Sequence, residues 1–366
     1  MRAALLEPST DQLKIVDDVE IGAPRPGEVR VRVSHCGLCH SDVSIVNGTF
    51  PTAMPTVLGH EAAGVVEEVG DGVDALAVGD KVVLCPVAAC DECYWCLRGE
   101  YGCCVRAASV STGTFLDGST PLSRNGVPVL RGVGVGGFAE QVVTPASGAV
   151  KVAPDTPLEI ACVIGCAVQT GVGAVLNTAR VEPGATVLVV GAGGVGIAIT
   201  QGARVAGASK IIVSDPVAER REAARRFGAT DVVDPASDDV AARAHALTDG
   251  IGVDYAFEAV GSAPLVESCL FATRNGGTTV MVGAAPIDHA VTLNPAVLFM
   301  LSERKLIGSF LGSCYGKRDI PKLLDLWRAG RLDFEGMITA RRPLSAINDA
   351  IADLTAARGI RTVIDL

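Results

Sequence analysis

The residues with the clearest capacity for chemistry are the cysteines, of which the chain has 12. Eight of them fall between Cys36 and Cys104, several at spacings that suit a metal ion. Met1–Leu13 lacks the features of a signal peptide, so we take a reducing cytoplasm as the expected location. In that compartment clustered thiols favour metal binding over disulfide formation.

The densest group of thiols has the pattern Cys90-x-x-Cys93-x-x-Cys96-x7-Cys104. Four thiolates suit a tetrahedral zinc ion with every position filled, which is typical of a structural site. Cys103 stands beside Cys104, so spacing alone leaves the fourth ligand ambiguous. The alternative interpretation is a set of free thiols or a redox loop.

A second candidate zinc set contains Cys39, which follows an expected strand, and His60-Glu61, which precedes another. A thiolate and an imidazole can bind zinc while a third ligand leaves the fourth position open for substrate. Local spacing does not identify that third ligand. Cys36 and Cys39 also have the Cys-x-x-Cys spacing of a metal site or a redox site. In addition, a single histidine is more often a structural residue than a metal ligand.

A glycine-rich turn points to a dinucleotide. Thr186–Val190 is a short apolar run that leads into Gly191-x-Gly193-x-x-Gly196, and a helix is expected to follow. Such glycines permit a tight turn, close approach of a diphosphate and close helix packing. Asp215 lies 19 residues beyond Gly196, where a carboxylate can bind ribose hydroxyls and repel a 2′-phosphate. NAD is therefore favoured over NADP, and an ordinary glycine-rich turn with a helix-capping Asp is the alternative.

The elements around these residues change character near residue 168. The first third reads as strands, of which the alternating Val29–Val33 is the clearest, and residues 106–137 form a long glycine-rich excursion. Beyond residue 168 strands and helices alternate, which predicts an α/β fold with a doubly wound parallel sheet. The expected strands are 29–33, 64–69, 81–84, 139–143, 186–190, 210–214, 254–258, 278–283, 306–308 and 361–366, and the expected helices are 195–207, 217–227, 322–328 and 346–356.

Charge and hydropathy exclude other classes of function. The chain has 31 Lys and Arg against 41 Asp and Glu, a net charge of −10, with no basic run. It is therefore a poor candidate for binding nucleic acid or an anionic membrane. No stretch approaches 18 uninterrupted apolar residues, so we expect no membrane span.

Taken together, these motifs resemble the zinc-containing medium-chain alcohol dehydrogenases, nearly from end to end. The layout is most similar to the liver-type alcohol dehydrogenases and the thiol-adduct formaldehyde dehydrogenases. The matching segments are Cys39-His-Ser-Asp42, Gly59-His-Glu-Ala-Ala-Gly64, the four-cysteine loop, Val163-Ile-Gly-Cys-Ala-Val-Gln-Thr170, Gly191–Gly196 and Ile360-Arg-Thr-Val363.

The resemblance implies a two-domain organisation. A GroES-like, β-rich catalytic domain would comprise residues 1–167 and 310–366 and hold a catalytic and a structural zinc ion. A Rossmann domain over residues 168–309 would bind NAD. The loop between Cys104 and Cys166 has the length found in dimeric relatives, which implies a homodimer that pairs through Ala290–Ile307.

The resemblance also assigns the catalytic zinc ligands. It implies Cys39, His60 and Cys166, and Cys166 would otherwise have read as a buried core residue. Glu61 matches a carboxylate that can approach the metal, and Asp42 matches the partner that orients His60. The implied structural ligands are Cys90, Cys93, Cys96 and Cys104.

The implied reaction is reversible hydride transfer between a primary or aryl alcohol, or its aldehyde, and NAD, with Ser41 accepting the alcohol proton. The small-molecule substrate itself is not identified by the sequence. The positions that match the family's cofactor contacts are His40, Thr170, Gly191, Gly193, Gly194, Val195, Gly196, Asp215, Arg220, Val282 and Arg361.

Several positions depart from the liver-type pattern. Ser44 stands where the liver-type pattern has a histidine that passes the proton to solvent. The sequence therefore does not identify the group that takes the proton from Ser41. Pro86 and Gly132 stand where relatives often place aromatic residues in the substrate channel, which indicates a wider pocket.

The formaldehyde branch uses an Arg where this chain has Ala108, and Arg106 lies two residues earlier. An acidic residue of that branch also lacks a clear match around Thr49 and Phe50. These departures weaken a thiol-adduct substrate as the alternative. Two further alternatives are an enzyme with permanently bound NAD, and a zinc-bearing regulator or structural protein without turnover.

Overall fold

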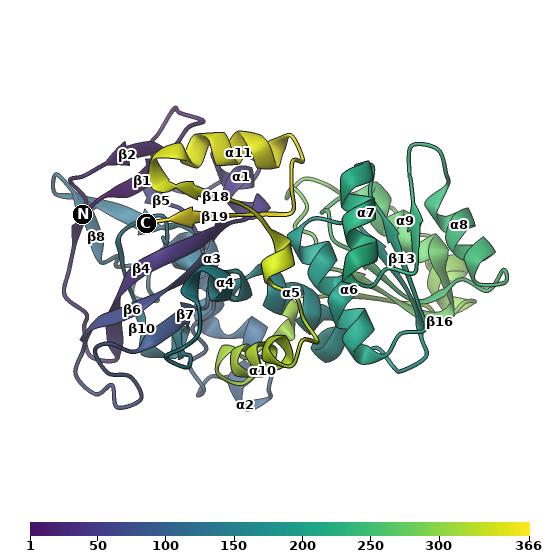
Figure 1. Ribbon diagram of the computed structural model, residues 1–366, viewed down its shortest axis with the longest axis horizontal. Coiled ribbons are helices and arrows are strands. Elements are labelled where there is room, and N and C mark those ends of the chain that lie inside the picture. Colours follow the sequence, from purple (N-terminus) through teal and green to yellow (C-terminus); the bar gives the residue numbers. More distant parts are fainter. The chain divides into compact units, whose positions relative to one another are not determined.

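The computed structural model describes residues 1–366 and divides them into two compact units, which Figure 1 shows coloured along the chain. The first unit comprises Met1–Ala167, Tyr315–Trp327 and Phe334–Leu366. The second comprises Val168–Cys314 and Arg328–Asp333. The second unit reaches past residue 309 because Gly312 packs against Gly173, where a Cβ on Gly173 would lie 2.5 Å from the Gly312 carbonyl oxygen.

Two β-sheets form the frame of the first unit. One has the strand order β2-β1-β5-β9-β8-β3, and the other has the order β11-β7-β6-β4-β19-β18 with β10 paired to β4. The strands are β1 (Ala3–Leu6), β2 (Lys14–Val16), β3 (Glu20–Ile21), β4 (Glu28–Leu38), β5 (Thr56–Val57), β6 (Glu61–Val69), β7 (Lys81–Leu84), β8 (Leu122–Arg124), β9 (Val127–Arg131), β10 (Gln141–Pro145), β11 (Ala149–Lys151), β18 (Ile338–Pro343) and β19 (Arg361–Asp365).

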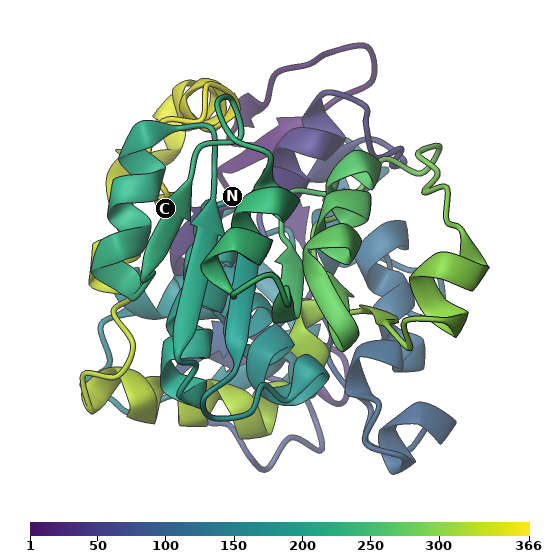
Figure 2. The ribbon, with the colours of Figure 1, turned by 90° about the vertical axis from the view of Figure 1, so that its right-hand side faces the viewer.

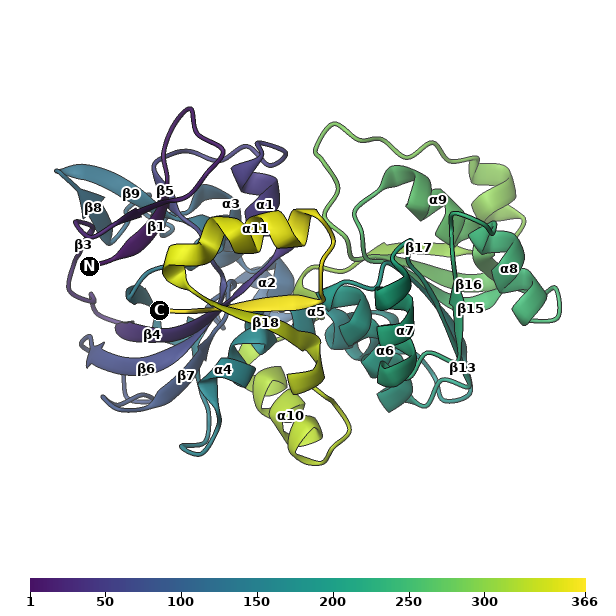
Figure 3. The same ribbon diagram turned by 45° about the horizontal axis from the view of Figure 1, so that its top comes forward.

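The central strand β4 shows how the sequence builds this unit. Val29, Val31 and Val33 are at most 3% exposed, whereas Arg32 between them is exposed. This alternation places one face of the strand in the apolar core, as its sequence pattern predicts. The helices of the unit are α1 (His40–Val46), α2 (Tyr94–Leu97), α3 (Ser109–Thr112), α4 (Leu158–Ala161), α10 (Gly316–Arg328) and α11 (Ile347–Thr355), of which α11 lies beside β18 and β19 (Figure 3).

The second unit is a six-stranded, fully parallel sheet with helices packed on it, seen in Figure 2. The strand order β14-β13-β12-β15-β16-β17 is that of a doubly wound dinucleotide-binding fold, so the predicted fold class is confirmed. The elements are α5 (Ala167–Gly173), which begins at the crossing from the first unit, then β12 (Thr186–Val190), α6 (Gly194–Ala206), β13 (Lys210–Ser214), α7 (Ala218–Phe227), β14 (Asp231–Val233), α8 (Val240–Leu247), β15 (Val253–Glu258), α9 (Ala263–Ala272), β16 (Thr273–Met281) and β17 (Lys305–Gly308).

The glycine-rich excursion over residues 106–137 is more regular than its sequence suggests. It contributes α3 and the strands β8 and β9 to the first unit. β9 pairs with the distant β5 through Thr56 and Val57, and this long-range pairing has no signature in local periodicity. Residues 106–137 therefore form regular strands of a sheet in the first unit.

No single helix is both long and apolar enough to cross a membrane. A bent pair, Leu158–Gly165 followed by Ala167–Ala179, reaches that length and composition only when its two parts are taken together.

Candidate active site and metal centres

Cys39 and Ser41 follow the end of β4 directly and lie close together. Cys39 is the N-cap of α1, and its backbone N–H donates to Oδ2 of Asp42 at 3.1 Å. The hydroxyl of Ser41 lies 3.8 Å from the Cys39 sulfur. Asp42 is fully buried, and its second oxygen accepts from the backbone N–H of Gly59 at 3.0 Å. One carboxylate thus ties the cysteine segment to the histidine segment.

His60 is held in a single orientation. Its Nδ1 lies 3.2 Å from Oδ1 of Asp42, and the side chain is 1% exposed. Gly59 before it has a φ of +88°, and a Cβ there would lie 2.7 Å from the ring of Phe138. Only glycine fits this turn, and the Asp42 contact leaves Nε2 of His60 as the free ligand atom.

Cys166 joins this cluster from a distant segment, between a 3₁₀ turn at Cys162–Gly165 and α5. The ligand atoms of Cys39, His60, Glu61 and Cys166 all lie within 4.8 Å of one another, and all four residues are buried. Two sulfurs, one imidazole and one carboxylate are donors that zinc accepts, so the residues present fit the metal that the sequence predicts.

Glu61 carries an unpaired oxygen in this cluster. Its Oε1 accepts from the backbone N–H of Ala167 at 3.1 Å and lies 3.4 Å from Arg361, but Oε2 has no hydrogen-bond partner. Gly37 makes room for that oxygen, because a Cβ on Gly37 would lie 2.1 Å from it. A fully buried carboxylate oxygen without a partner is costly, and a bound cation would satisfy it.

The electrostatics of the cluster also suit a cation. The hydrogen bond from Cys166 lowers the pKa of the Cys39 thiol well below its usual range, and the same contact raises the pKa of Cys166. The two sulfurs therefore share one proton. Burial raises the pKa of Glu61 to about 7, against the opposing charge of Arg361. A divalent cation would replace the shared proton, because thiolate is the form that ligates metal.

The four-cysteine loop forms a second, separate cluster in which the ligand atoms of Cys90, Cys93, Cys96 and Cys104 lie within 4.8 Å of one another. The Cys90 sulfur is 3.6 Å from that of Cys104 and 3.9 Å from that of Cys96. Zinc–sulfur bonds of about 2.3 Å in a tetrahedron require sulfurs about 3.8 Å apart. Cys103 is exposed, so the geometry points to Cys104 where spacing was ambiguous.

The glycine-rich turn follows β12 as the sequence predicts. Gly191 has a φ of +96°, and a Cβ on Gly196 would lie 1.7 Å from the Gly191 carbonyl oxygen. Gly193 is the N-cap of α6, and a Cβ there would meet no atom of the protein within 4 Å. Gly191 and Gly196 thus serve the turn itself, whereas Gly193 leaves open space where a diphosphate could approach the helix N-terminus.

Asp215 is tied to this turn. It follows β13 and is 4% exposed, its Oδ2 accepts from the backbone N–H of Ala192 at 2.8 Å, and its Oδ1 accepts from Val217 at 2.8 Å. A carboxylate has about four acceptor positions, so two remain for a ribose. The other predicted cofactor residues of this unit are placed as follows: Gly194 and Val195 in the first turn of α6, Arg220 in α7, Val282 just after β16 and Thr170 in α5.

Two predicted cofactor residues lie in the first unit. His40 is exposed at the first position of α1. Arg361 is 4% exposed and donates from Nη1 to the Leu38 carbonyl at 2.7 Å, beside Glu61. In the structure Arg361 is therefore a neighbour of the candidate catalytic metal cluster.

Sequence reasoning missed Glu258. This residue ends β15, pairs across the sheet with Val190, and is 1% exposed. Its Oε1 accepts from the backbone N–H groups of Val260 and Gly261 at 2.9 and 2.8 Å, which fixes the loop against the Gly191 turn. A lone Glu at the end of an apolar strand, in a position like that of Asp215, was the available signal.

Comparison with known proteins assigns the family. Residues 25–155 match the family model described as an alcohol dehydrogenase GroES-like domain, and residues 194–329 match that of a zinc-binding dehydrogenase. The chain is 36% identical to S-(hydroxymethyl)glutathione dehydrogenases of Escherichia coli and Shigella sonnei, over 99% of each chain.

Solved structures agree with this assignment. A benzyl alcohol dehydrogenase from Acinetobacter calcoaceticus superposes with a TM-score of 0.94 at 30% identity, covering 100% of this chain and 99% of that one. An alcohol dehydrogenase zinc-binding domain protein from Burkholderia ambifaria has a TM-score of 0.94 at 34% identity, covering 100% and 98%. The chain belongs to the zinc-containing medium-chain alcohol dehydrogenase family.

Proposed function

We propose that this protein is an NAD-dependent dehydrogenase of primary or aryl alcohols, acting reversibly on the corresponding aldehydes. The observation that carries the proposal is the buried convergence of Cys39, His60 and Cys166, with Ser41 at 3.8 Å from the first of them. A non-catalytic zinc protein would have no need of a hydroxyl at this position.

The chain's own residues have separate tasks in this proposal. Zinc would be held by Cys39, His60 and Cys166 and would lower the pKa of an alcohol, while NAD would accept the hydride. Ser41 accepts the proton that leaves the alcohol, and Asp42 keeps His60 in one tautomer and orientation. The structural cluster of four cysteines would hold a second zinc ion, which orders its loop.

Asp215 supports NAD as the cofactor. Its buried carboxylate keeps two acceptor positions for ribose hydroxyls and would repel a 2′-phosphate. Asp215→Ala should therefore raise the KM for NAD and lower that for NADP, and an unchanged preference would contradict this role. Gel filtration of the purified protein, followed by its absorbance spectrum, distinguishes exchangeable NAD from NAD that stays bound.

The substrate class rests on Ala108. The position where the formaldehyde branch has an Arg carries no charge, which favours an uncharged alcohol over an anionic thiol adduct. The S-(hydroxymethyl)glutathione dehydrogenases remain the second candidate because relatives of that name align over 99% of the chain. A panel of primary and aryl alcohols with and without glutathione tests this, since a rate that requires glutathione would favour the second candidate.

Cys166→Ser tests the metal assignment. We expect the purified variant to retain one of two zinc ions per chain and to lose turnover. Full activity with an undiminished zinc content would refute the ligand set. Cys162→Ser is the matched control, because Cys162 is also buried but lies outside the cluster.

We also propose that the protein forms a homodimer through residues 290–307. Val297, Met300 and Leu301 are 53%, 71% and 72% exposed in the single chain. Exposed apolar side chains in the segment that precedes the edge strand β17 are typical of a surface that pairs with a second copy.

A further inference from the structure

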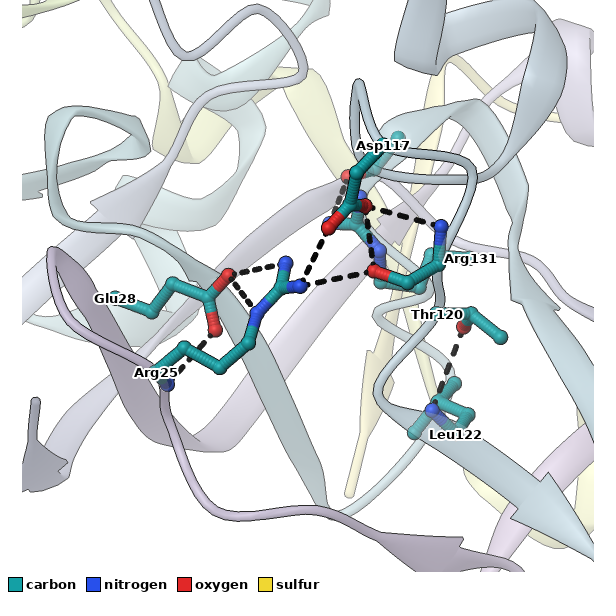
Figure 4. Close-up of polar contacts among 8 residues, drawn as sticks. Arg25, Glu28, Asp117, Thr120, Leu122 and Arg131 are labelled. Carbon is teal, nitrogen blue, oxygen red and sulfur yellow. Dashed lines mark hydrogen bonds and ion pairs between the residues drawn. The ribbon is translucent and has the colours of Figure 1, made fainter.

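Glu258 is a buried acid to which the proposed reaction gives no task. It is the last residue of β15 and is 1% exposed, and its Oε1 accepts from the N–H groups of Val260 and Gly261. Glu28, by contrast, pairs with Arg25, whose Nη2 donates to its carboxylate at 2.8 Å (Figure 4). Burial raises the pKa of the Glu258 carboxyl, and the backbone N–H groups act against that rise. The Glu258 side chain therefore serves the loop that follows β15.

The backbone of Glu258 holds a second loop, at the end of β16. Its carbonyl oxygen accepts from the N–H groups of Val282 and Gly283, both at 2.9 Å. The two loops touch through their backbones, because a Cβ on Gly283 would lie 2.1 Å from the backbone nitrogen of Gly261. One residue thus fixes the loop after β15 and the loop after β16 in a common arrangement.

The loop after β15 also borders the glycine-rich turn after β12. A Cβ on Gly191 would lie 2.7 Å from the side chain of Val260, and the N–H of Ala259 donates to the Val190 carbonyl at 2.9 Å. β12 and β15 are the neighbouring strands at which the strand order reverses. Doubly wound sheets bind their ligands outside the carboxyl ends of the strands at this point. The loop that Glu258 holds therefore borders the expected dinucleotide site.

The strand order also gives the order of the ligand's parts along this edge of the sheet. Asp215 follows β13 and is proposed to bind the adenosine ribose, and Gly193 follows β12 and is proposed to face the diphosphate. β15 and β16 come next, on the side of β12 away from β13. A dinucleotide that places these two parts over β13 and β12 therefore brings its nicotinamide ribose to the loops that Glu258 holds.

We propose that Glu258 is a positioning residue for the nicotinamide half of the dinucleotide, an inference that rests on the proposed NAD site. It acts through the loop N–H groups that its carboxylate binds and through Val282, whose N–H its carbonyl binds. Without these bonds the two loops would have to be ordered when the cofactor binds, at a cost in affinity. The adenosine half, over β13, is bound by other residues.

Calorimetric titrations of the zinc-loaded protein with NADH and with AMP separate the two halves, because AMP lacks the nicotinamide nucleotide. Glu258→Leu removes the acceptor at similar volume, so its Kd for NADH should rise by about tenfold or more while its Kd for AMP stays unchanged. Glu258→Gln keeps a carbonyl oxygen that can accept both N–H groups, so it should bind NADH as wild type does.

Glu28→Gln is the matched control. Glu28 is a buried acid of the other unit, at 7% exposed, and its carboxylate serves Arg25. This variant should lower the Tm without changing either Kd, which separates a loss of stability from a loss of cofactor positioning. Glu258→Asp keeps the test decisive if Glu258→Leu fails to fold, because its shorter side chain withdraws the oxygen from the loop N–H groups.

Three outcomes would overturn the proposal while leaving the NAD site standing. The first is that the Leu and Asp variants bind NADH as wild type does. The second is that AMP affinity falls as much as NADH affinity, since the effect would then extend over the whole site. The third is that Glu258→Gln is as weak as Glu258→Leu, since charge rather than the N–H contacts would then matter. A wild-type protein that binds neither ligand would overturn the proposed NAD site and this inference together.

Discussion

At the scale of single residues, the candidate catalytic cluster combines groups that are costly to bury separately. Asp42 and Glu61 are fully buried acids, and they differ in how they are satisfied. Asp42 accepts two backbone N–H groups and faces His60, whereas Glu61 leaves one oxygen without a partner. Asp42 therefore holds His60 and the neighbouring backbone in place. Glu61 needs a metal ion or a proton to satisfy its second oxygen.

A pH dependence of stability follows from Glu61. Its pKa is raised to about 7 in the folded protein from an ordinary value of 4.5, so the folded state holds a proton that the unfolded state releases as the pH rises. In zinc-free protein, the free energy of unfolding should fall between about pH 4.5 and 7, by roughly 3 kcal/mol from this residue. Urea titrations across that range measure it.

Glu61→Gln is the matched variant for that measurement. The amide cannot ionise, so the difference in unfolding free energy between wild type and variant should shift steadily in favour of the variant from pH 4.5 to 7. A difference that stays constant over this range would show that Glu61 is not buried in the acid form.

At the scale of elements, short irregular segments carry the sites and regular strands position them. The loop of the four cysteines contains only α2, of four residues, and brief 3₁₀ turns. Tyr94 and Leu97 in it are 65% and 75% exposed, so little apolar burial holds this loop. Tyr101 stacks on Tyr315 and Asp91 pairs with Lys317, and a metal bound by the four thiols would add to these few contacts.

Cys103 and Cys104 provide a paired test of that loop. Cys104→Ser should lose one of two zinc ions per chain and lower the Tm by roughly 5–10 °C, because the sulfur that closes the tetrahedron is gone. Cys103→Ser should leave both quantities unchanged, since its side chain is exposed. Zinc analysis and calorimetry measure the effects, and equal behaviour of the two variants would reject the assignment.

Gly193 and Gly196 provide a second pair, in the turn before α6. Gly193→Ala has room for its methyl group and a φ of −73°, so it should fold normally but weaken NADH binding tenfold or more, about 1.4 kcal/mol. Gly196→Ala would bring its Cβ to 1.7 Å from a carbonyl oxygen, so it should lower the Tm. Fluorescence titration and thermal unfolding separate the effects, and normal NADH affinity in Gly193→Ala would contradict a diphosphate at this turn.

At the scale of the whole molecule, each unit supplies a different half of the proposed chemistry. The first unit contains both candidate metal clusters, and the second contains the dinucleotide turn with Asp215. The edge strand β17 and the apolar segment before it belong to the second unit. If that segment pairs with another copy, association would leave the metal clusters of each chain intact.

The oligomeric state tests this arrangement. The double variant Met300→Glu and Leu301→Glu should convert a dimer to a monomer, because each charge would have to be buried in the interface. Leu97→Glu is the control, since Leu97 is 75% exposed in the other unit. Sedimentation velocity distinguishes the species, and a wild-type protein that is monomeric at micromolar concentration would refute the dimer.

Local patterns in the sequence predicted part of the elements and the types of ligand, but they missed helices such as α8 and α9 and the first strands, β1 to β3. The alternation of Val29–Val33 and the glycines after β12 depend on neighbouring residues, so periodicity and turn chemistry predict them. The short strand β14 and the pairing of β9 with β5 were not predicted, because each is stabilised by distant strands. The choice of Cys166 came from the family resemblance, since nothing local separates it from a core cysteine.

Tertiary structure decided which side chains have partners. The fold places Cys104, and not Cys103, among the other sulfurs, and it places Arg361 beside Glu61. The reason is physical: residue type determines what a side chain can bind, whereas burial and the meeting of residues up to 300 positions apart determine what it does bind.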